Sequence, residues 1–347
     1  MADPAPKEIP AQAAAALAEA IRVAGVTDHV DLVTRIVATG LGLGMDDTDR
    51  LDLKITAAAL EEMRDAFRLF APYAGVDKVT VFGSARTKPH DPLYAQAENV
   101  AAALAEQGWM VVTGAGPGIM EAAAEGAGPD LSIGVSIRLP FEEKPNPLVA
   151  DDPNHVTMKY FFTRKLMLMK ESRGFVCLPG GFGTMDEMFE LLTLQQTGKA
   201  EPMPIVLLDK VGGSYWTGLR DFVVEHLGGG GYIAADDLDR VLITDSVDAA
   251  AAEIAGFWRN YDSMRWVGDR LVLRLRHEPT DAEVDELGER FASLVRAGRI
   301  ARSAPLGPER TDRDRLDLPR LALELDPFKV GDLHLLIRAL NALGSAS

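Results

Sequence analysis

Residues 175–187 read Phe175-Val176-Cys177-Leu178-Pro179-Gly180-Gly181-Phe182-Gly183-Thr184-Met185-Asp186-Glu187. The first four are apolar and typical of a short buried strand, which Pro179 and the two glycines end. A helical pattern begins near Thr184, so the order is strand, glycine turn and helix start. The first turn of a helix leaves backbone N–H groups free, and these donors and the helix dipole favour an anion. The stretch therefore predicts a phosphate-binding turn.

Two carboxylates, Asp186 and Glu187, stand in the same helical turn as these donors. A phosphate needs no carboxylate beside it, which indicates that one of the two takes part in chemistry. Adjacent residues of a helix point about 100° apart, so the two are not expected to face the same ligand.

The composition is that of an ordinary globular protein. Of 347 residues, 47% are apolar and 25% are charged, enough for one large domain with an appendage or for two domains. No run of about 18 apolar residues occurs, so no transmembrane helix is predicted. The start has no basic region followed by an apolar core, so no secretory signal is predicted either. The cytoplasm is the expected location.

The net charge and the small number of cysteine and histidine residues limit which ligands are expected. A net charge of −16 argues against a general nucleic-acid binder, although local donors can still capture a small phosphorylated ligand. The single cysteine, Cys177, excludes an intrachain disulfide and is predicted to be a buried strand residue. The six histidines form no ligand-spaced pair, so no metal site is predicted.

Strands and helices alternate through the middle of the chain. Strands are predicted at 78–82, 109–113, 132–139, 175–178, 204–208 and 240–244. Helices are predicted at 92–107, 119–124, 160–172, 184–197, 215–227 and 247–260. This alternation predicts an α/β fold with a Rossmann-like, doubly wound parallel sheet covered on both faces, whose ligands lie at the carboxyl ends of the strands.

The two ends of the chain differ from this middle part. The segment 11–70 has a helical, alanine-rich pattern with breaks at 25–28 and 40–49. After 265, strands are predicted at 271–275 and 321–325, and helices at 281–297 and 332–343. We therefore predict a helical N-terminal extension (1–74), a nucleotide-binding catalytic domain (75–262) and a small α+β C-terminal domain (263–347).

Three glycine-bearing turns, 83–86, 114–118 and 179–184, are expected to converge at the carboxyl edge of the sheet. The second does not fit the dinucleotide fingerprint, because Ile119 stands where its third glycine belongs and no acidic residue follows at the end of the next strand. No turn is followed by Gly-Lys-Ser/Thr, so a P-loop is excluded. Phosphate binding of a mononucleotide is the favoured interpretation, and glycines that merely make tight turns are the alternative.

The pair Arg164-Lys165 and the segment 179–187 resemble the Arg-Lys and Pro-Gly-Gly-x-Gly-Thr-x-x-Glu motifs of the Lonely Guy family, once labelled lysine decarboxylases. Segments 82–87, 113–121 and 139–146 also fit this family, and the resemblance covers roughly residues 75–260. One departure is Ala115, where the family often has glycine.

This resemblance implies a phosphoribohydrolase that needs no cofactor. Members of the family cleave the N-glycosidic bond of nucleoside 5′-monophosphates, AMP or cytokinin riboside monophosphate among them, and release free base and ribose 5-phosphate. The resemblance also implies a homodimer or higher homo-oligomer with the site near a subunit boundary. Neither nucleic acid nor a membrane is an expected partner, and the preferred base is left open.

The resemblance also implies roles for single residues. Glu187, which closes the motif, is expected to stabilise the ribosyl cation or orient the attacking water, with Asp186 as the alternative. Arg164 is expected to bind or orient the nucleotide. The other residues expected to bind substrate or its phosphate are Gly83, Ser84, Gly114, Gly116, Gly118, Glu121, Lys165, Gly180, Gly181, Gly183 and Thr184.

Two rival functions use the same chain differently. A non-catalytic carrier of a nucleotide or of the molybdenum cofactor would bind a phosphorylated ligand at the same loops without turnover. An amino-acid decarboxylase would need a Schiff-base lysine for pyridoxal phosphate. Lys165, Lys170 and Lys199 are present, but no independent cofactor motif places any of them.

Overall fold

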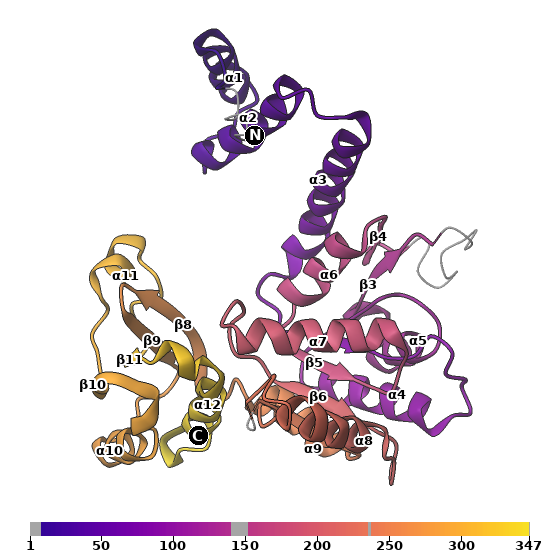
Figure 1. Cartoon of the computed structure of the whole chain (residues 1–347), viewed down its shortest axis with the longest axis vertical. Coiled ribbons are helices and arrows are strands. Elements are labelled where there is room, and N and C mark those ends of the chain that lie inside the picture. Colours follow the sequence, from indigo (N-terminus) through magenta and orange to yellow (C-terminus); the bar gives the residue numbers. More distant parts are fainter. Residues whose placement is uncertain (1–7, 140–151, 235–236, 347) are drawn as a thin grey trace. The chain divides into compact units, whose positions relative to one another are not determined.

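The computed structural model of the chain describes residues 8–139, 152–234 and 237–346 (Figure 1). The chain forms two compact units, residues 1–64 and residues 65–347. Most of the predicted loop 140–154, and of the segment 139–146 that fits the family, lies outside the described residues. None of the described helices combines the length and the apolar character that a membrane span requires.

The N-terminal unit is helical, as predicted. It contains α1 (Ala11–Val23), α2 (Val30–Met45) and the first part of α3 (Arg50–Phe70), which continues into the second unit. The break predicted at 40–49 is present only at 46–49, because α2 continues through its three glycines to Met45 and α3 begins at Arg50. A glycine inside a helix costs only about 1 kcal/mol relative to alanine, which is too little to end a long helix.

The second unit is built on a seven-stranded sheet in which all neighbouring strands are parallel. Its strands are β1 (Lys78–Phe82), β2 (Met110–Thr113), β3 (Ser132–Ile137), β4 (His155–Met158), β5 (Gly174–Cys177), β6 (Ile205–Leu208) and β7 (Val241–Thr244). The order is β4-β3-β2-β1-β5-β6-β7, which confirms the doubly wound prediction. The chain reverses direction across the sheet between β1 and β5, so these two strands form the switch point where ligands of such sheets bind.

Helices cover both faces of this sheet (Figure 1). One face carries α4 (Pro92–Ala105), α5 (Ile119–Ala127) and α9 (Val247–Gly256), and α4 contacts both of the others. The opposite face carries α6 (Phe161–Lys170), α7 (Phe182–Gln196) and α8 (Tyr215–Phe222), which a π-helical segment continues to Gly228. Every residue of β1, β2, β5 and β6 is buried, as a strand between two helical layers requires.

Side chains alternate between the two layers along each strand. In β1, Val79 and Val81 belong to the core shared with α4 and α9, whereas Thr80 faces α6 and donates its hydroxyl to the Leu168 carbonyl at 2.8 Å. The core continues through Phe257 into the C-terminal part of the chain. One hydrophobic core therefore extends from the α4 and α9 face of the parallel sheet into the C-terminal part.

The C-terminal part is a four-stranded antiparallel sheet with helices, in agreement with the predicted α+β class. The sheet order is β10-β11-β9-β8, formed by β8 (Tyr261–Val267), β9 (Arg270–Leu275), β10 (Val295–Arg302) and β11 (Arg320–Leu325). The helices are α10 (Asp281–Arg290), α11 (Gly307–Asp312) and α12 (Leu333–Asn341).

One expectation for this part is wrong in detail. The helix predicted over 281–297 ends at Arg290, and its last residues belong to β10. β10 carries three arginines and is exposed over most of its length, which is typical of an edge strand and hides the apolar alternation. The domain boundary expected after residue 262 falls inside β8, so the three-part division of the chain stays a prediction.

Candidate active site

The turns that follow β1, β2 and β5 meet at the carboxyl edge of the parallel sheet. The Ser84 N–H donates to the Pro179 carbonyl at 3.3 Å, and the Ile119 N–H donates to the Ser84 carbonyl at 3.1 Å. Backbone hydrogen bonds thus join all three predicted glycine turns at the switch point. Ser84 is the shared residue, through its backbone rather than its hydroxyl.

Gly83 and Gly118 permit this close approach. A Cβ at Gly83 would lie 2.5 Å from the Ile119 side chain, and a Cβ at Gly118 would lie 2.5 Å from the Ser84 carbonyl oxygen. Gly118 also has a φ of +72°, a conformation that favours glycine. The packing of the loops therefore explains why glycine stands at these two positions, independently of any contact with a ligand.

Gly114 makes room for Arg164. A Cβ at Gly114 would lie 1.9 Å from Nη2 of Arg164. The same Nη2 donates to the Gly114 carbonyl at 3.2 Å, and Nε donates to the Val135 carbonyl at 2.8 Å. The guanidinium is therefore fixed by carbonyls of β3 and of the turn after β2, while Nη1 has no hydrogen-bond partner within the described residues. Burial lowers the pKa of Arg164, and the charge of Glu187 opposes that shift.

Ala115 is strained. Its φ is +53°, in the left-handed region, and its N–H donates to the Thr113 hydroxyl at 3.1 Å. Holding a residue with a Cβ in this region costs roughly 1–2 kcal/mol, which gives a physical reason for the glycine that the family often has here. The neighbouring Gly116 faces the flexible end of Met120, because a Cβ there would lie 2.6 Å from the Met120 methyl group.

The turn after β5 leaves open space around its glycines. Helix α7 begins at Phe182, two residues before the predicted start, and the Met185 N–H makes the first bond of the helix, to the Gly181 carbonyl at 3.1 Å. The N–H groups of Phe182, Gly183 and Thr184 consequently have no acceptor within the helix. A Cβ at Gly181 or at Gly183 would meet no atom within 4 Å, so a ligand has access to this turn.

Thr184 lies under the turn rather than in this open space. Its side chain is 5% exposed, and its hydroxyl would lie 2.2 Å from a Cβ at Gly180. Gly180 therefore accommodates Thr184. In this structure the Thr184 hydroxyl contributes to the packing of the turn. The donors that a ligand can reach are the backbone N–H groups of the first helical turn.

Glu187 is half-buried and has no hydrogen-bonded or ion-paired partner within the described residues. Burial raises its pKa to about 7, although the positive charges of Arg164 and Lys165 act in the opposite direction. The thiol of Cys177 is fully buried, and burial together with the charge of Glu187 raises the pKa of that thiol. The Glu187 carboxyl group is thus near the carboxyl end of β5.

Lys165 holds the other carboxylates of α7. Its Nζ lies 2.7 Å from Oδ2 of Asp186 and 2.6 Å from Oε2 of Glu190. Burial lowers the pKa of Lys165, but the hydrogen bonds to Asp186 and Glu190 outweigh burial and raise it. Asp186 is directed toward α6, so the two neighbouring carboxylates are separated as helix geometry predicts.

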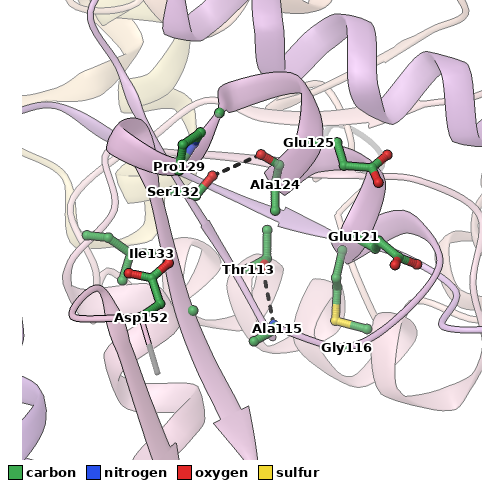
Figure 2. Close-up of a pocket in the computed structure, with 13 residues that line it drawn as sticks. Thr113, Ala115, Gly116, Glu121, Ala124, Glu125, Pro129, Ser132, Ile133 and Asp152 are labelled. Carbon is green, nitrogen blue, oxygen red and sulfur yellow. Dashed lines mark hydrogen bonds between the residues drawn. The ribbon is translucent and has the colours of Figure 1, made fainter. Parts of the chain in front are cut away.

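Glu121 lies apart from Glu187. It lines a cavity of about 210 Å³ on the α5 side of the sheet, together with Thr113, Gly116 and Met120. Figure 2 shows Glu121 and Glu125 on one side of this cavity and Asp152 on the other. The principal negative charges that act on Glu187 are those of Asp186 and Glu190, both on α7.

Sequence reasoning missed one contact to the glycine turn. Tyr215, the first residue of α8, donates its hydroxyl to the Gly180 carbonyl at 2.5 Å. The two residues are 35 positions apart in the chain, and no motif connects them. Only the packing of α8 beside α7 reveals the contact.

These groups combine an anion site with an acid–base group. The open N–H donors at the start of α7 suit a phosphate, and Glu187 lies about one helical turn, roughly 5.4 Å, further along the same helix. A carboxyl group with a pKa near neutrality can exchange a proton or carry a negative charge under the same conditions. Within the described residues, no three His, Cys, Asp or Glu side chains gather as metal ligands.

The chain is similar to named proteins across this part of the sequence. A protein-family model described as "Possible lysine decarboxylase" matches residues 117–254. A Mycobacterium marinum protein named cytokinin riboside 5′-monophosphate phosphoribohydrolase is 30% identical over 165 residues, 46% of this chain and 84% of that protein. A Mycobacterium tuberculosis protein with the same name is 30% identical over 170 residues, 48% of this chain and 87% of that protein.

A solved structure shows a looser likeness. The molybdenum cofactor carrier protein of Chlamydomonas reinhardtii is 20% identical, with 52% of this chain and 96% of that chain covered and a TM-score of 0.37. A score this low carries no argument about function.

Proposed function

Because this chain belongs to the Lonely Guy family, we propose that it hydrolyses the N-glycosidic bond of nucleoside 5′-monophosphates to free base and ribose 5-phosphate. The names of the two mycobacterial relatives support this class of substrate, and AMP and cytokinin riboside monophosphate are the proposed examples. The observation that carries the proposal is Glu187, a half-buried carboxyl group without a partner in the described residues, beside Arg164 and one turn from the open N–H donors.

The 5′-phosphate is proposed to bind at the start of α7. Gly181 and Gly183 leave space there, and the first helical N–H groups have no acceptor within the helix. The positive end of the helix dipole adds to the attraction. This binding would fix the ribose next to the carboxyl group of Glu187.

Glu187 is proposed to act in its ionised form. When the bond between the base nitrogen and C1′ breaks, positive charge develops on the ribose, and a nearby carboxylate stabilises it. The same carboxylate can accept a hydrogen bond from the water that attacks C1′. As the bond from the water oxygen to C1′ forms, the water passes one proton to the Glu187 carboxylate, and the departing base nitrogen takes up one proton from solvent. The proton on Glu187 then returns to solvent, so one water is consumed for each base and ribose 5-phosphate released.

Arg164 is proposed to orient the nucleotide through the part of its guanidinium that makes no hydrogen bond in the described residues. Its other nitrogens are held by two carbonyls, so the free Nη1 has a defined direction. Lys165 is proposed to act less directly, because Asp186 and Glu190 already occupy its ammonium group.

The chemistry named in the family description fits this site poorly. A Schiff-base lysine is activated by a lowered pKa. The pKa of Lys165 is raised, because hydrogen bonds to two carboxylates hold its charged form. We therefore derive no decarboxylation step.

A homodimer or higher homo-oligomer is part of the proposal. Several large apolar side chains of α6 and α7 are exposed close to the site: Phe161, Phe162, Leu166, Phe182 and Phe189. A second copy that covered them would place the site near a subunit boundary, as the resemblance implies.

The activity test uses the purified full-length chain with AMP, with adenine and ribose 5-phosphate as the measured products. Glu187→Gln is expected to lower kcat/KM by about 10³-fold, because a positioned acid–base group contributes roughly 10²–10⁴-fold. Asp186→Asn is the matched control on the same helix and is expected to stay within tenfold of the wild type. Full activity of folded Glu187→Gln, or inactivity confined to Asp186→Asn, would refute the assignment of Glu187.

Measuring both AMP binding and adenine release with the same protein distinguishes a hydrolase from a ligand carrier. Binding of AMP without release of adenine over a panel of nucleoside monophosphates would favour a carrier instead. A panel that includes nucleosides as dephosphorylated controls also measures how much the 5′-phosphate contributes.

A further inference from the structure

The hydroxyl of Tyr215 holds the glycine turn through the carbonyl of Gly180. It donates to the Gly180 carbonyl at 2.5 Å, a short bond between two uncharged groups. The neighbouring carbonyl of the turn, that of Pro179, accepts the N–H of Ser84 at 3.3 Å. Both carbonyls that precede the start of α7 are thus fixed by residues from other loops.

Tyr215 is itself held firmly. Its N–H donates to Oδ2 of Asp209 at 2.8 Å, and Oδ1 of Asp209 accepts the N–H of Lys210 at 2.8 Å. Asp209 is 4% exposed, and its carbonyl accepts a hydrogen bond from the Gln96 side chain at 2.7 Å. The carboxylate therefore closes the loop between β6 and α8 and sets the position of the first residue of α8.

The ring of Tyr215 has a fixed neighbour as well. It packs edge-on against Trp216, with ring centroids 4.9 Å apart. Trp216 is fully buried, and its Nε1 donates to the Leu208 carbonyl at 3.2 Å. The Tyr215 hydroxyl is consequently a preorganised donor rather than a mobile surface group.

The bond to Gly180 acts on the peptide group that Gly180 shares with Gly181. In a trans peptide the N–H of Gly181 points away from the Gly180 carbonyl, and the chain has no cis peptide in its described residues. Anchoring the carbonyl on Tyr215 therefore directs the Gly181 N–H to the other side. That N–H has no hydrogen-bond partner in the described residues, and space is open around Gly181. A hydrogen bond to the carbonyl also polarises the peptide and strengthens its N–H as a donor.

We propose that Tyr215 is a positioning residue for phosphate recognition, which orients the Gly180–Gly181 peptide so that its N–H binds the 5′-phosphate. This inference rests on the proposed function for its substrate. Without the phenol, the peptide has two flexible glycines and loses its fixed orientation. Phosphate-bearing ligands would then bind less tightly, whereas the reacting groups at C1′ would be unchanged.

The test compares Tyr215→Phe with a matched control, Tyr73→Phe. Tyr73 makes an equally short phenolic bond, to Oδ1 of Asn154 at 2.6 Å, but both partners stand before their strands, at the opposite edge of the sheet. Tyr215→Phe is expected to raise KM for AMP about fivefold, the usual net value of one hydrogen bond, with kcat within twofold of the wild type. Tyr73→Phe is expected to leave KM unchanged.

Two further measurements make the result specific. The dissociation constant of ribose 5-phosphate, measured by calorimetry, is expected to rise about fivefold in Tyr215→Phe only. Hydrolysis of adenosine, which has no phosphate, is expected to be equal in Tyr215→Phe and wild type. Unchanged binding of ribose 5-phosphate by Tyr215→Phe would overturn the inference, as would an equal loss toward adenosine and AMP.

The calorimetric arm also separates this inference from the proposed function. If the wild type binds ribose 5-phosphate but hydrolyses no nucleotide, the proposed function fails. In that case a weaker complex in Tyr215→Phe still supports the role of Tyr215. Thermal unfolding of the three proteins shows whether a loss of binding reflects a loss of folded protein.

Discussion

Glu187 and Glu309 are two glutamates with arginines close by, in opposite states. Glu309 is fully buried, and Arg274 and Arg320 bind its Oε1 at 2.8–3.2 Å, while the Leu306 N–H binds its Oε2 at 2.9 Å. Burial alone would raise the pKa of Glu309, but these hydrogen bonds outweigh burial and lower it. Burial also raises the pKa of the half-buried Glu187, to about 7, and no hydrogen bond from a donor in the described residues offsets that rise.

This difference shows that hydrogen bonds to its oxygens decide whether burial raises or lowers the pKa of a glutamate here. A buried carboxylate whose oxygens all accept hydrogen bonds is a structural ion, and its neighbours hold its charge. A less buried carboxyl group without such bonds keeps its acceptors for a ligand. Unsatisfied oxygens beside an arginine are thus a better indication of a site than burial or charge.

The largest expected change in the free energy of unfolding is at Glu309, the glutamate whose oxygens are all bound. Glu309→Gln is expected to lower the free energy of unfolding by about 3 kcal/mol at pH 7, because Arg274 and Arg320 lose a buried partner. The folded-state pKa of Glu309 is lowered, so its stabilising effect is present above the unfolded value of 4.5 and is lost as pH falls through the folded-state pKa. Urea unfolding at several pH values measures both.

Glu324→Gln is the matched control for that experiment. Glu324 lies 3.5 Å from Arg296, and the side chains are 34% and 51% exposed. An exposed pair contributes little, so a change below 1 kcal/mol is expected. A similar loss in both variants would mean that burial of the ion pair has no special effect.

A substitution at Glu187 is expected to raise the free energy of unfolding, by a smaller amount. Its folded-state pKa of about 7 is above the unfolded value of 4.5, so the folded protein binds this proton more tightly and loses stability as pH rises from 4.5 to 7. Glu187→Gln is therefore expected to stabilise the protein at pH 8 by about 1–2 kcal/mol, an amount reduced for partial exposure. Urea unfolding should show that the gain disappears below pH 4.5, and destabilisation at pH 8 would contradict the unsatisfied state of Glu187.

The smallest effect concerns Lys165, whose positive charge lowers the pKa of Glu187. If ionised Glu187 is the active form, kcat/KM for AMP rises with pH through about 7. Lys165→Met is expected to move this rise to higher pH and to lower the rate at pH 7 roughly two- to fivefold, with recovery at higher pH.

Lys170→Met, on the same helix, is the control for that pH profile. Lys170 pairs with Glu171 and is not one of the principal charges that act on Glu187. A loss in Lys165→Met that is equal at all pH values would instead indicate that Lys165 binds the substrate directly.

Much of the fold could be predicted because its strands are buried on both faces. β5 and β6 are short apolar runs between helical patterns, as is β1 apart from Lys78 and Thr80, and such runs indicate a parallel sheet without any long-range information. β4 and β10 were harder to predict. β4 is a partly exposed edge strand of the parallel sheet, so it lacks the continuous apolar run of β5 or β6. β10 is a charged edge strand, and its pairing with β11 stabilises it more than its own sequence pattern does.

The site could be predicted in its residue types but not in its electrostatics. Gly180 to Glu187 form a local pattern, so the order of donors and carboxylates can be read from the sequence. The raised pKa of Glu187, the pairing of Lys165 with Asp186 and the bond from Tyr215 depend on contacts between separate helices. The strain at Ala115 is equally invisible, because it is a property of the loop and not of the residue.

The burial of Cys177 has a practical consequence for spectroscopy. It is the single cysteine of the chain, it is fully buried, and its pKa is raised, so thiol reagents are expected to spare it in the folded protein. A cysteine introduced at Phe182, a side chain 96% exposed beside the glycine turn in the single chain, would be the one reactive thiol, and assembly with a second copy would slow its labelling. A fluorophore attached there could follow ligand arrival in real time without a cysteine-free background.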